Sequence, residues 1–487
     1  MPDEHRSHTV SLGDLAMGKE DEVLGLLNRG TIHEGMSVFT ASLGHPRLES
    51  GRMENKRAMG EEVVVIVGAG QSGLAAAACL TALSVPCVIL ERDDCIASLW
   101  RNRCYDRVSL HLQKQLCQLP QAPHPPETPM YMPKQDFIRY LEDYAARFRL
   151  RINLHRKVES TEYDAEAGKW RLVAMNGEDG SMEEYVARYV VVATGENDEI
   201  VVPEIPGLEG FSGPVVHSSL YRSGSEYEGK SVLVVGCGNS GMEVALDLAE
   251  HGATTHIVVR SKVRIHQPIH VLLTASLCES AAAEAETPLP TYAMILSRFL
   301  PCKVVDTIIL LLCHLEFGSL AEYGIRRPAK GPMYLKEHSP VYPVMDCGTV
   351  KKIKSGHIKV CGCVFYLIHL TTGIEQTLIP RLDASQVLPA IKHIEGDDVT
   401  FSDGRTQHFD AIVLATGYRS TVKRWLKGDD CLIDEAGMAK ETYPNNWKGR
   451  NGLYCAGLAR RGIYGSAEDA LKIADDIADD HHKHTTQ

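Results

Sequence analysis

The stretch EEVVVIVGAGQSGLAAAACLTAL, residues 61–83, decides the fold of this chain. It contains the apolar run Val63–Val67, which is typical of a buried strand, and it ends in a run of Ala and Leu, which favour a helix. Between the two runs, Gly68, Gly70 and Gly73 have the G-x-G-x-x-G spacing. Glycine at these positions permits a tight turn, a close approach of a phosphate to the backbone, and close packing of helix on strand. The stretch therefore predicts a strand, a phosphate-binding turn and a helix.

The next apolar run, VPCVILER at residues 85–92, predicts a second strand that ends at Glu91. A carboxylate at the end of that strand accepts hydrogen bonds from the ribose hydroxyls of a dinucleotide. The free N–H groups at the start of the helix, together with its dipole, attract the pyrophosphate. A merely tight strand–helix turn is the alternative. We predict a dinucleotide site made by Gly68, Ala69, Gly70, Gln71, Ser72, Gly73 and Glu91.

A second copy of the pattern is KSVLVVGCGNSGMEVALDLAEHG, residues 230–252, followed by the strand-like run THIVVR. Glu91 lies 23 positions after Gly68, and Arg260 lies 24 positions after Gly236, so an arginine stands where the first copy has an acid. A carboxylate would repel the 2′-phosphate of NADPH, whereas a guanidinium binds it through two hydrogen bonds. We therefore assign FAD to the first copy and NADPH to the second, with a solvated arginine at a strand end as the alternative. The residues predicted to bind NADPH are Gly236, Cys237, Gly238, Asn239, Ser240, Gly241, Arg260 and Ser261.

Strands that alternate with helices predict the α/β class, with parallel sheets covered on both faces. Two apolar strands end in the same tripeptide, at YVVVATG (189–195) and FDAIVLATG (409–417), and we assign Thr416 and Gly417 to a cofactor site. Because the second tripeptide lies far beyond the second glycine turn, we predict two Rossmann-like dinucleotide-binding domains, with the NADPH domain inserted into a discontinuous FAD domain. The predicted bounds are 61–210 and 388–480 for the FAD domain and 211–387 for the NADPH domain.

The overall composition excludes several classes of function. The net charge of −12 argues against nucleic-acid binding. The 14 cysteines include no C-x-x-C pair or metal-ligand spacing, so we predict neither a metal site nor a redox dithiol, and reduced thiols indicate the cytoplasm. The longest apolar stretch, Val304–Leu315, is shorter than the ~20 residues that span a bilayer. It predicts a buried helix, with peripheral contact at a membrane such as the endoplasmic-reticulum surface as the alternative.

The segment FSGPVVHSSLY, residues 211–221, lies just before the second glycine turn and has the pattern F-x-G-x-x-x-H-x-x-x-Y. This pattern between two G-x-G-x-x-G turns resembles the class B flavin-containing monooxygenases. Longer matches resemble one group of them, the plant YUCCA flavin monooxygenases of auxin synthesis. The matching pieces are ASLWRNRCYDRVSLHLQKQLCQLP (97–120), ATGEN (193–197), RPAKGP (327–332), PVMDCGTVKKIKSG (343–356), FDAIVLATGYRS (409–420) and NGLYCAGLARRG (451–462).

The resemblance implies a reaction in which the cofactor supplies the chemistry. NADPH reduces FAD, oxygen adds to give a C4a-peroxyflavin, and indole-3-pyruvate, an aromatic α-keto acid, loses CO₂ to become indole-3-acetate. Asn197 is the candidate polar catalytic group near the junction of flavin and NADP, and a loop asparagine that caps its own backbone is the alternative. Trp100 is a further candidate for packing on the flavin. The resemblance implies no side-chain nucleophile, and the oligomeric state stays open.

Three segments depart from the family pattern. Residues 1–60 predict a disordered extension with one short helix around Leu15–Leu27. Residues 265–292 and 361–386 are atypical inserts within the NADPH domain. The second insert is either a tolerated surface hairpin or translated intron sequence, and disrupted packing there would weaken flavin binding while every motif remains.

Three other functions compete with an indole-3-pyruvate monooxygenase. An amine- or thioether-oxygenating monooxygenase would share the fold. A disulfide reductase needs a dithiol near the flavin, which the missing C-x-x-C disfavours. An inactive paralogue would carry the glycine turns but hold no flavin.

Overall fold

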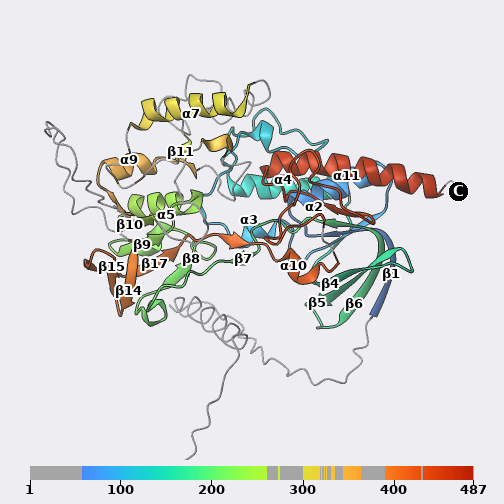
Figure 1. The fold of residues 1–487 in the computed structure, drawn as a ribbon, viewed down its shortest axis with the longest axis horizontal. Helices are drawn as coiled ribbons and strands as arrows, with labels where there is room; N and C mark the ends of the chain where they lie inside the picture. The colour runs from blue at the N-terminus through green and yellow to red at the C-terminus, as the bar shows by residue number, and fades with distance from the viewer. Residues whose placement is uncertain are drawn as a thin grey trace, which may run out of the picture.

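The computed structural model describes residues 57–259, 300–318, 344–362, 390–428 and 431–485, together with a few short stretches between 273 and 334. The described elements form two lobes that lie side by side (Figure 1). The short helix expected around Leu15–Leu27, the insert at 265–292 except Leu273–Thr274, and the insert at 361–386 except its first two residues lie outside the described residues. Residues 57–60, expected in the extension, belong to the first strand instead.

The first lobe is built on a seven-stranded sheet. The strand order is β3-β2-β1-β6-β5-β4, and β19 also pairs with β6. The pairs among β1, β2, β3, β6 and β19 are parallel, whereas β4, β5 and β6 form an antiparallel extension. The strands are β1 (Arg57–Val67), β2 (Cys87–Leu90), β3 (Ile152–Asn153), β4 (Arg156–Asp164), β5 (Lys169–Asn176), β6 (Met182–Val192) and β19 (Leu453–Cys455).

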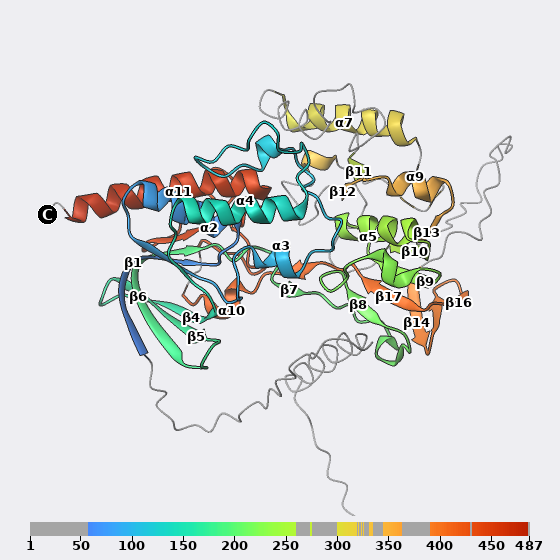
Figure 2. The same cartoon turned by 180° about the vertical axis from the view of Figure 1, so that it is seen from behind.

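Helices α2 (Gln71–Ala82), α4 (Lys134–Arg147) and α11 (Gly462–Thr485) lie together along one side of this sheet (Figures 1 and 2). Residues 72–80 of α2 are all buried, and four of them are Ala. A helix enclosed on every side needs small side chains all around, which explains why this stretch is apolar without an amphipathic stripe. Short helices α3 (Ser98–Asn102) and α10 (Val422–Trp425) complete the lobe.

The second lobe is built on a five-stranded sheet of order β13-β10-β9-β17-β8, in which every pair is parallel. Helices α5 (Asn239–Glu250) and α9 (Thr349–Lys354) pack on one face, and a three-stranded antiparallel sheet packs on the other. The strands are β8 (Val215–His217), β9 (Ser231–Val235), β10 (Thr254–Val259), β13 (Ile358–Gly362), β17 (Ala411–Leu414), and β14 (Ile391–Glu395), β15 (Asp398–Phe401) and β16 (Thr406–His408) of the small sheet. A further pair, β11 (Leu273–Thr274) and β12 (Val344–Met345), is also parallel.

The predicted fold class, two Rossmann-like units with the second inserted into the first, is confirmed. The boundary expected at residue 388 differs from the observed pairing. Strand β17 pairs with β9 and β8, and the β14–β16 sheet packs on the same unit, so residues 391–414 belong to the second lobe. The reason is that the parallel sheet of this lobe includes β17, a strand that lies beyond the second insert in the chain. The pairing of β17 with β9 therefore joins segments that are far apart in sequence.

The chain passes between the lobes at two neighbouring crossings. Strand β7 (Glu199–Ile200) leaves the first lobe, and β18 (Tyr418–Arg419) returns to it. The two pair as a short antiparallel ribbon between the lobes, visible beside α3 in Figure 2. The crossings are therefore joined to each other by backbone hydrogen bonds.

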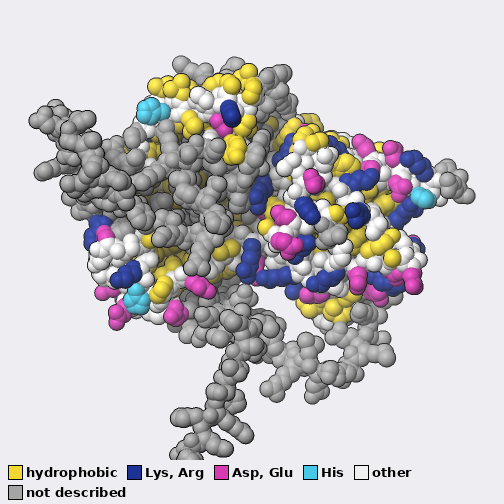
Figure 3. Space-filling model, in the orientation of Figure 1, with side chains coloured by type: hydrophobic (Ala, Val, Ile, Leu, Met, Phe, Trp, Pro, Cys, Tyr) yellow, Lys and Arg dark blue, Asp and Glu magenta, His cyan; other side chains and the backbone are white. Residues whose placement is uncertain are grey.

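The apolar stretch Val304–Leu315 lies in helix α7 (Cys302–Phe317), above the second lobe (Figure 1). Val305, Ile309 and Cys313 are buried, whereas Leu311 and Leu315 are 57% and 72% exposed. Apolar side chains gather on the outer face of this helix (Figure 3). The helix thus has one buried face, as a buried helix would, and one exposed apolar face, as peripheral contact with a membrane would require. Among the described helices, none is long and apolar enough to cross a bilayer.

Candidate functional site

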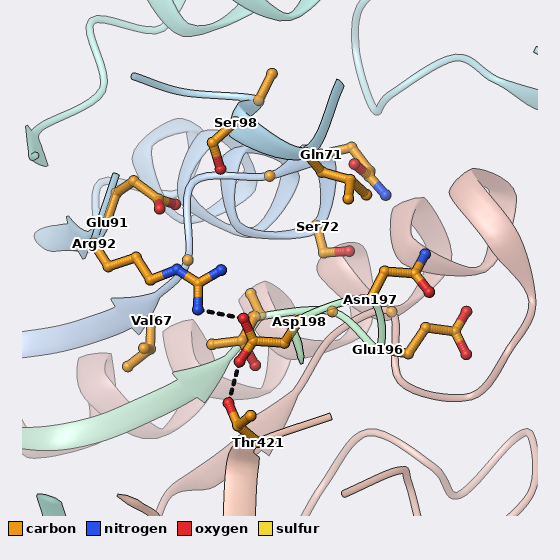
Figure 4. Close-up of a pocket in the computed structure, with 18 of the residues that line it drawn as sticks. Val67, Gln71, Ser72, Glu91, Arg92, Ser98, Glu196, Asn197, Asp198 and Thr421 are labelled. Atoms are coloured by element: carbon orange, nitrogen blue, oxygen red, sulfur yellow. Dashed lines mark hydrogen bonds and ion pairs between the residues drawn. The ribbon is translucent and has the colours of Figure 1, made fainter. Parts of the chain in front are cut away.

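A cavity of about 210 Å³ opens at the carboxyl ends of β1, β2 and β6 in the first lobe (Figure 4). This is the edge of a parallel sheet at which nucleotides bind in doubly wound folds. Its wall is formed by four segments: the glycine turn, the start of α3, the first crossing and the start of α11. The residues that line it include Gly68, Gly70, Gln71, Ser72, Glu91, Arg92, Trp100, Asn197, Asp198, Thr421, Gly457 and Ser466.

The glycines of the first turn divide into two kinds by their surroundings. Gly68 has φ +108°, and a Cβ there would lie 2.7 Å from the carbonyl oxygen of Ala193. A Cβ on Gly73 would lie 1.9 Å from the carbonyl oxygen of Gly68. A Cβ on Gly70, in contrast, would meet nothing within 4 Å. Gly68 and Gly73 are therefore required by the fold, while Gly70 keeps open the space into which a ligand would approach.

Glu91 lies at the wall of the same cavity and is only 7% exposed. Its Oε2 accepts a hydrogen bond from the backbone N–H of Ala69 at 2.6 Å, and its Oε1 accepts one from Asp93 at 3.0 Å. Burial raises the pKa of this carboxyl, and the two backbone hydrogen bonds act in the opposite direction. A carboxylate has about four acceptor positions, so it can still accept from a sugar hydroxyl.

Trp100 and Asn197, which the sequence predicts to lie near the cofactor, both line the cavity. The Trp100 indole donates to Gln71 Oε1 at 3.4 Å, and its ring packs edge-on against Phe137 at 5.1 Å. Asn197 lies beside Glu196, on the opposite side of the view from Glu91 (Figure 4). The geometry fits a packing role for the indole and a polar contact for the amide.

The sequence did not single out the residues that connect the parts of this cavity. Arg92 forms an ion pair with Asp198, and the Thr421 hydroxyl donates to the same carboxylate (Figure 4). Asp198 thus joins the end of β2 to both crossings. Arg92 directly follows Glu91, which is the only sequence signal that could have pointed to it.

The C-terminal part of the chain also reaches this cavity. The Ser72 hydroxyl at the start of α2 donates to the Ser466 hydroxyl in the first turn of α11 at 2.8 Å. A Cβ on Gly457 would lie 2.3 Å from Ser72 Oγ. Gly457 and Gly462 belong to the stretch NGLYCAGLARRG, so the role of that motif is to bring a second helix start to the cavity.

The second glycine turn repeats the geometry of the first. Gly236 has φ +114°, and a Cβ there would lie 2.3 Å from the carbonyl oxygen of Ala415, while a Cβ on Gly238 would meet nothing within 4 Å. Ala193 and Ala415 each open an A-T-G tripeptide, so each tripeptide closes against the glycine turn of its own lobe. The carbonyl oxygen of Gly417 then accepts a backbone hydrogen bond from Val201 at 3.0 Å, which places Thr416 and Gly417 at the crossing.

The other residues predicted to bind NADPH differ in their surroundings. The side chain of Asn239 accepts a hydrogen bond from the backbone N–H of Met345 at 2.7 Å, so it fixes the β12 backbone to the start of α5. Cys237 is buried, and burial raises its pKa to about 12, which keeps it a neutral thiol. Arg260 and Ser261 lie outside the described residues.

His217 of the F-x-G-x-x-x-H-x-x-x-Y motif links the second lobe to the crossing. Its Nδ1 accepts from the backbone N–H of Ser219 at 3.1 Å, so the ring proton lies on Nε2, which donates to the carbonyl oxygen of Gly417 at 3.3 Å. Burial lowers the pKa of His217 to about 4, and the ring stays neutral at physiological pH. Its role is therefore to position the A-T-G turn.

Comparison with known proteins agrees with this geometry. Residues 65–275 match the family described as pyridine nucleotide-disulphide oxidoreductase. The chain is 45% identical over 414 residues to the probable indole-3-pyruvate monooxygenase YUCCA9 of Arabidopsis thaliana, covering 85% of this chain and 88% of that one. It is 44% identical over 413 residues to the indole-3-pyruvate monooxygenase YUCCA1 of Oryza sativa subsp. japonica, covering 85% and 90%. The chain belongs to the YUCCA monooxygenase family.

Solved structures support the fold of this YUCCA-family chain. A flavin-containing monooxygenase from Stenotrophomonas maltophilia superposes with a TM-score of 0.56 at 19% identity, over 86% of this chain and 99% of that one. A bacillithiol disulfide reductase from Bacillus cereus gives the same TM-score, identity and coverage, so the fold alone does not separate oxygenation from disulfide reduction. Among the described residues, no cysteine lines the cavity. The YUCCA relatives, rather than the fold, decide between the two.

Asp198 gives the first testable prediction for this YUCCA-family site. We expect Asp198→Ala to weaken FAD binding about tenfold, a loss of roughly 1.4 kcal/mol, because Arg92 and Thr421 lose their shared partner. The measurement is FAD affinity after removal and return of the flavin. The matched control is Asp93→Ala, whose carboxylate lies 3.6 Å from Arg92 and is more exposed. Equal affinities for the two variants would show that the Asp198 contacts do not support the cofactor site.

Proposed function

We propose that this chain converts indole-3-pyruvate to indole-3-acetate with NADPH and O₂, using FAD. One observation carries the proposal: identity of 44–45% to indole-3-pyruvate monooxygenases across about nine-tenths of their length. The cavity and the two glycine turns supply independent support, because the same chain has two separate places suited to a dinucleotide. The substrate class is then an aromatic α-keto acid.

The cavity of the first lobe offers FAD open space and backbone hydrogen-bond donors. Gly70 leaves open space where a pyrophosphate would approach, and the starts of α2 and α11 both face the cavity. We assign the pyrophosphate to the turn Gly68–Gly73, the ribose to Glu91, and the ring system to the region of Trp100 and Asn197. When bound, FAD accepts hydride from NADPH and activates oxygen, and the chain's own contribution is binding, orientation and exclusion of water.

The second turn fits NADPH on the same grounds. Gly238 leaves open space above the start of α5, and Gly236 and Gly241 are packed against backbone atoms. We assign the 2′-phosphate to Arg260 and Ser261, which follow β10 in the chain. Gly417 and Thr416 lie where the two lobes meet, which supports a role in aligning the nicotinamide with the flavin. Asn197 is our candidate for the polar group on the flavin side of that junction.

The proposal is tested by the flavin spectrum and by substrate-dependent oxidation of NADPH under air. We expect a yellow protein whose NADPH oxidation rises on addition of indole-3-pyruvate, with indole-3-acetate as the product. Turnover of amines or thioethers but not of α-keto acids would favour the amine- or thioether-oxygenating alternative. A colourless protein that cannot be reconstituted with FAD would favour an inactive paralogue.

Arg260 gives a prediction about cofactor preference. We expect Arg260→Ala to raise the KM for NADPH by roughly 10- to 100-fold, since hydrogen bonds to a charged group contribute about 1.5–3 kcal/mol. The KM for NADH of the same variant is the internal control, because NADH lacks the 2′-phosphate. A parallel rise in both values would assign Arg260 to packing instead.

A further inference from the structure

Three side chains that are distant in sequence meet where the two lobes touch. His111 comes from the first lobe, Glu243 from α5, and Cys347 from the turn before α9. His111 Nε2 lies 3.3 Å from Glu243 Oε1, and Cys347 Sγ lies 3.5 Å from the same oxygen. One ligand atom from each residue lies within 4.8 Å of the other two. In the described part of the chain, this is the one group of three His, Cys, Asp or Glu side chains with such spacing.

Each of the three residues is held in place by its own surroundings. The backbone N–H of Leu110, next to His111, donates to the carbonyl oxygen of Met132 at 2.8 Å. Glu243 lies on the buried side of α5. The turn that carries Cys347 is fixed to α5 at both ends, by the Met345–Asn239 hydrogen bond at 2.7 Å and by the Thr349 hydroxyl, which donates to the carbonyl oxygen of Met242 at 2.9 Å. The arrangement is thus preorganised and not a chance meeting of mobile side chains.

The environment of Glu243 favours a cation between these side chains. Glu243 is only 4% exposed, and its Oε2 is occupied by the Tyr105 hydroxyl, which leaves Oε1 facing His111 and Cys347. His111 Nε2 is buried and, although 3.3 Å from Oε1, lacks the geometry of a hydrogen bond. The Glu243 oxygen and the His111 nitrogen, which has no hydrogen-bond partner among the described residues, lie beside the Cys347 sulfur, where a shared cation would satisfy all three.

We propose that His111, Glu243 and Cys347 bind a divalent transition-metal ion, with Zn²⁺ as the best fit. Zinc takes imidazole, carboxylate and thiolate ligands in a tetrahedron. Its usual bond lengths place neighbouring nitrogen and oxygen ligands about 3.3 Å apart and sulfur and oxygen ligands about 3.5 Å apart. The observed separations of 3.3 Å and 3.5 Å match both edges. One carboxylate and one thiolate would balance the ion's charge, and water would fill the fourth position.

The proposed site would connect the lobes, because one ligand comes from the first and two come from the second. Tyr105 also belongs to the first lobe and orients the Glu243 carboxylate through its other oxygen, which is how outer partners usually support metal ligands. The ion would thereby fix the angle at which the NADPH lobe meets the FAD lobe. This role is separate from the oxygenation chemistry and does not depend on the substrate.

The test is zinc content of the full-length, flavin-bound protein. The protein is treated with a chelator, loaded with Zn²⁺, dialysed, and measured for zinc per flavin by mass spectrometry. We expect the wild type to retain one more zinc per flavin than Cys347→Ser or His111→Gln, each of which should bind zinc at least ~10-fold more weakly. Cys95→Ser is the matched control, since Cys95 is a partly buried cysteine of the first lobe that does not belong to the group of three, and it should retain zinc like the wild type.

A second readout covers variants that lose flavin or fold poorly. Wild-type protein loaded with Co²⁺ instead of Zn²⁺ should show a thiolate-to-cobalt charge-transfer band in the difference spectrum against the cobalt-free protein. Equal zinc retention by the wild type, Cys347→Ser and His111→Gln, or a wild-type cobalt spectrum with no thiolate band, would overturn the proposal.

Discussion

Gly70→Ala is expected to give a folded protein without flavin, whereas Gly238→Ala is expected to keep its flavin and bind NADPH about 100-fold more weakly. The two glycines occupy the same place in the two turns. Gly70 has φ −77° and Gly238 has φ −72°, so an L-residue is allowed at both. A Cβ at either position meets nothing within 4 Å of the protein. The added methyl group therefore interferes only with a ligand that approaches the backbone.

The measurement is the ratio of flavin to protein absorbance after purification, together with the KM for NADPH. Thermal unfolding of the flavin-free proteins should be unchanged, because the fold loses no contact. Gly210→Ala is the control, since a Cβ there also meets nothing within 4 Å and the residue belongs to the short helix Leu208–Gly210 and to neither glycine turn. If Gly70→Ala retains stoichiometric flavin, or if Gly238→Ala loses flavin instead of NADPH affinity, the assignment of the two cofactors is wrong.

The variants Gly68→Ala and Gly236→Ala are expected to strain the backbone of the protein itself. Both glycines have a positive φ, and a Cβ would lie 2.7 Å and 2.3 Å from a carbonyl oxygen of the neighbouring A-T-G turn. A strained backbone of this kind costs about 1–3 kcal/mol, so these variants lose stability as well as cofactor. The pairs thus separate the contribution of the turn to the fold from its contribution to the ligand.

Asp247→Ala is expected to destabilise the second lobe by about 3 kcal/mol, because buried donors lose a charged acceptor. Asp247 is 4% exposed. Its Oδ2 accepts from the Tyr221 hydroxyl at 2.6 Å and from the backbone N–H of Gly224 at 2.7 Å. Tyr221 is the last residue of the F-x-G-x-x-x-H-x-x-x-Y motif, so the prediction also tests what that tyrosine does. A lobe of this size should lose roughly 6–12 °C of melting temperature.

The matched control for Asp247 lies on the same helix. Glu250 is more exposed and pairs with Arg107 at 2.8 Å, and Glu250→Ala should change stability by less than about 1 kcal/mol. Circular dichroism during heating of the flavin-bound proteins gives both values. A melting temperature for Asp247→Ala equal to that of Glu250→Ala would contradict a structural role for the buried carboxylate.

The local parts of the fold follow directly from sequence. The strands that end at Val67 and Val235, the two glycine turns and the helices after them were predictable because each is encoded by neighbouring residues. Glu91, Trp100 and Asn197, which the sequence assigns to a cofactor site, line one cavity, and their roles there stay predictions. In each case a short motif carries both the backbone geometry and the residue that uses it.

The long-range parts of the fold were not predictable in the same way. Strand β17 pairs with β9 across more than the length of the insert, which is why the boundary at residue 388 was misplaced. Asp198 meets Arg92 and Thr421 only because the crossings bring them together. The His111, Glu243 and Cys347 group has no metal-ligand spacing along the chain, and only the fold brings these three side chains together. Contacts of this kind leave no periodic signal in a single sequence.

The most direct test of the proposed function is the fate of molecular oxygen in a single assay. The flavin-bound protein is given NADPH and indole-3-pyruvate under ¹⁸O₂, and the product is analysed by mass spectrometry. The overall balance requires that NADPH and O₂ convert the keto acid to indole-3-acetate, CO₂, NADP⁺ and water. We expect indole-3-acetate with one ¹⁸O in its carboxylate, formed in proportion to the NADPH consumed. Consumption of NADPH without labelled indole-3-acetate, from protein that holds its flavin, would contradict the proposed activity.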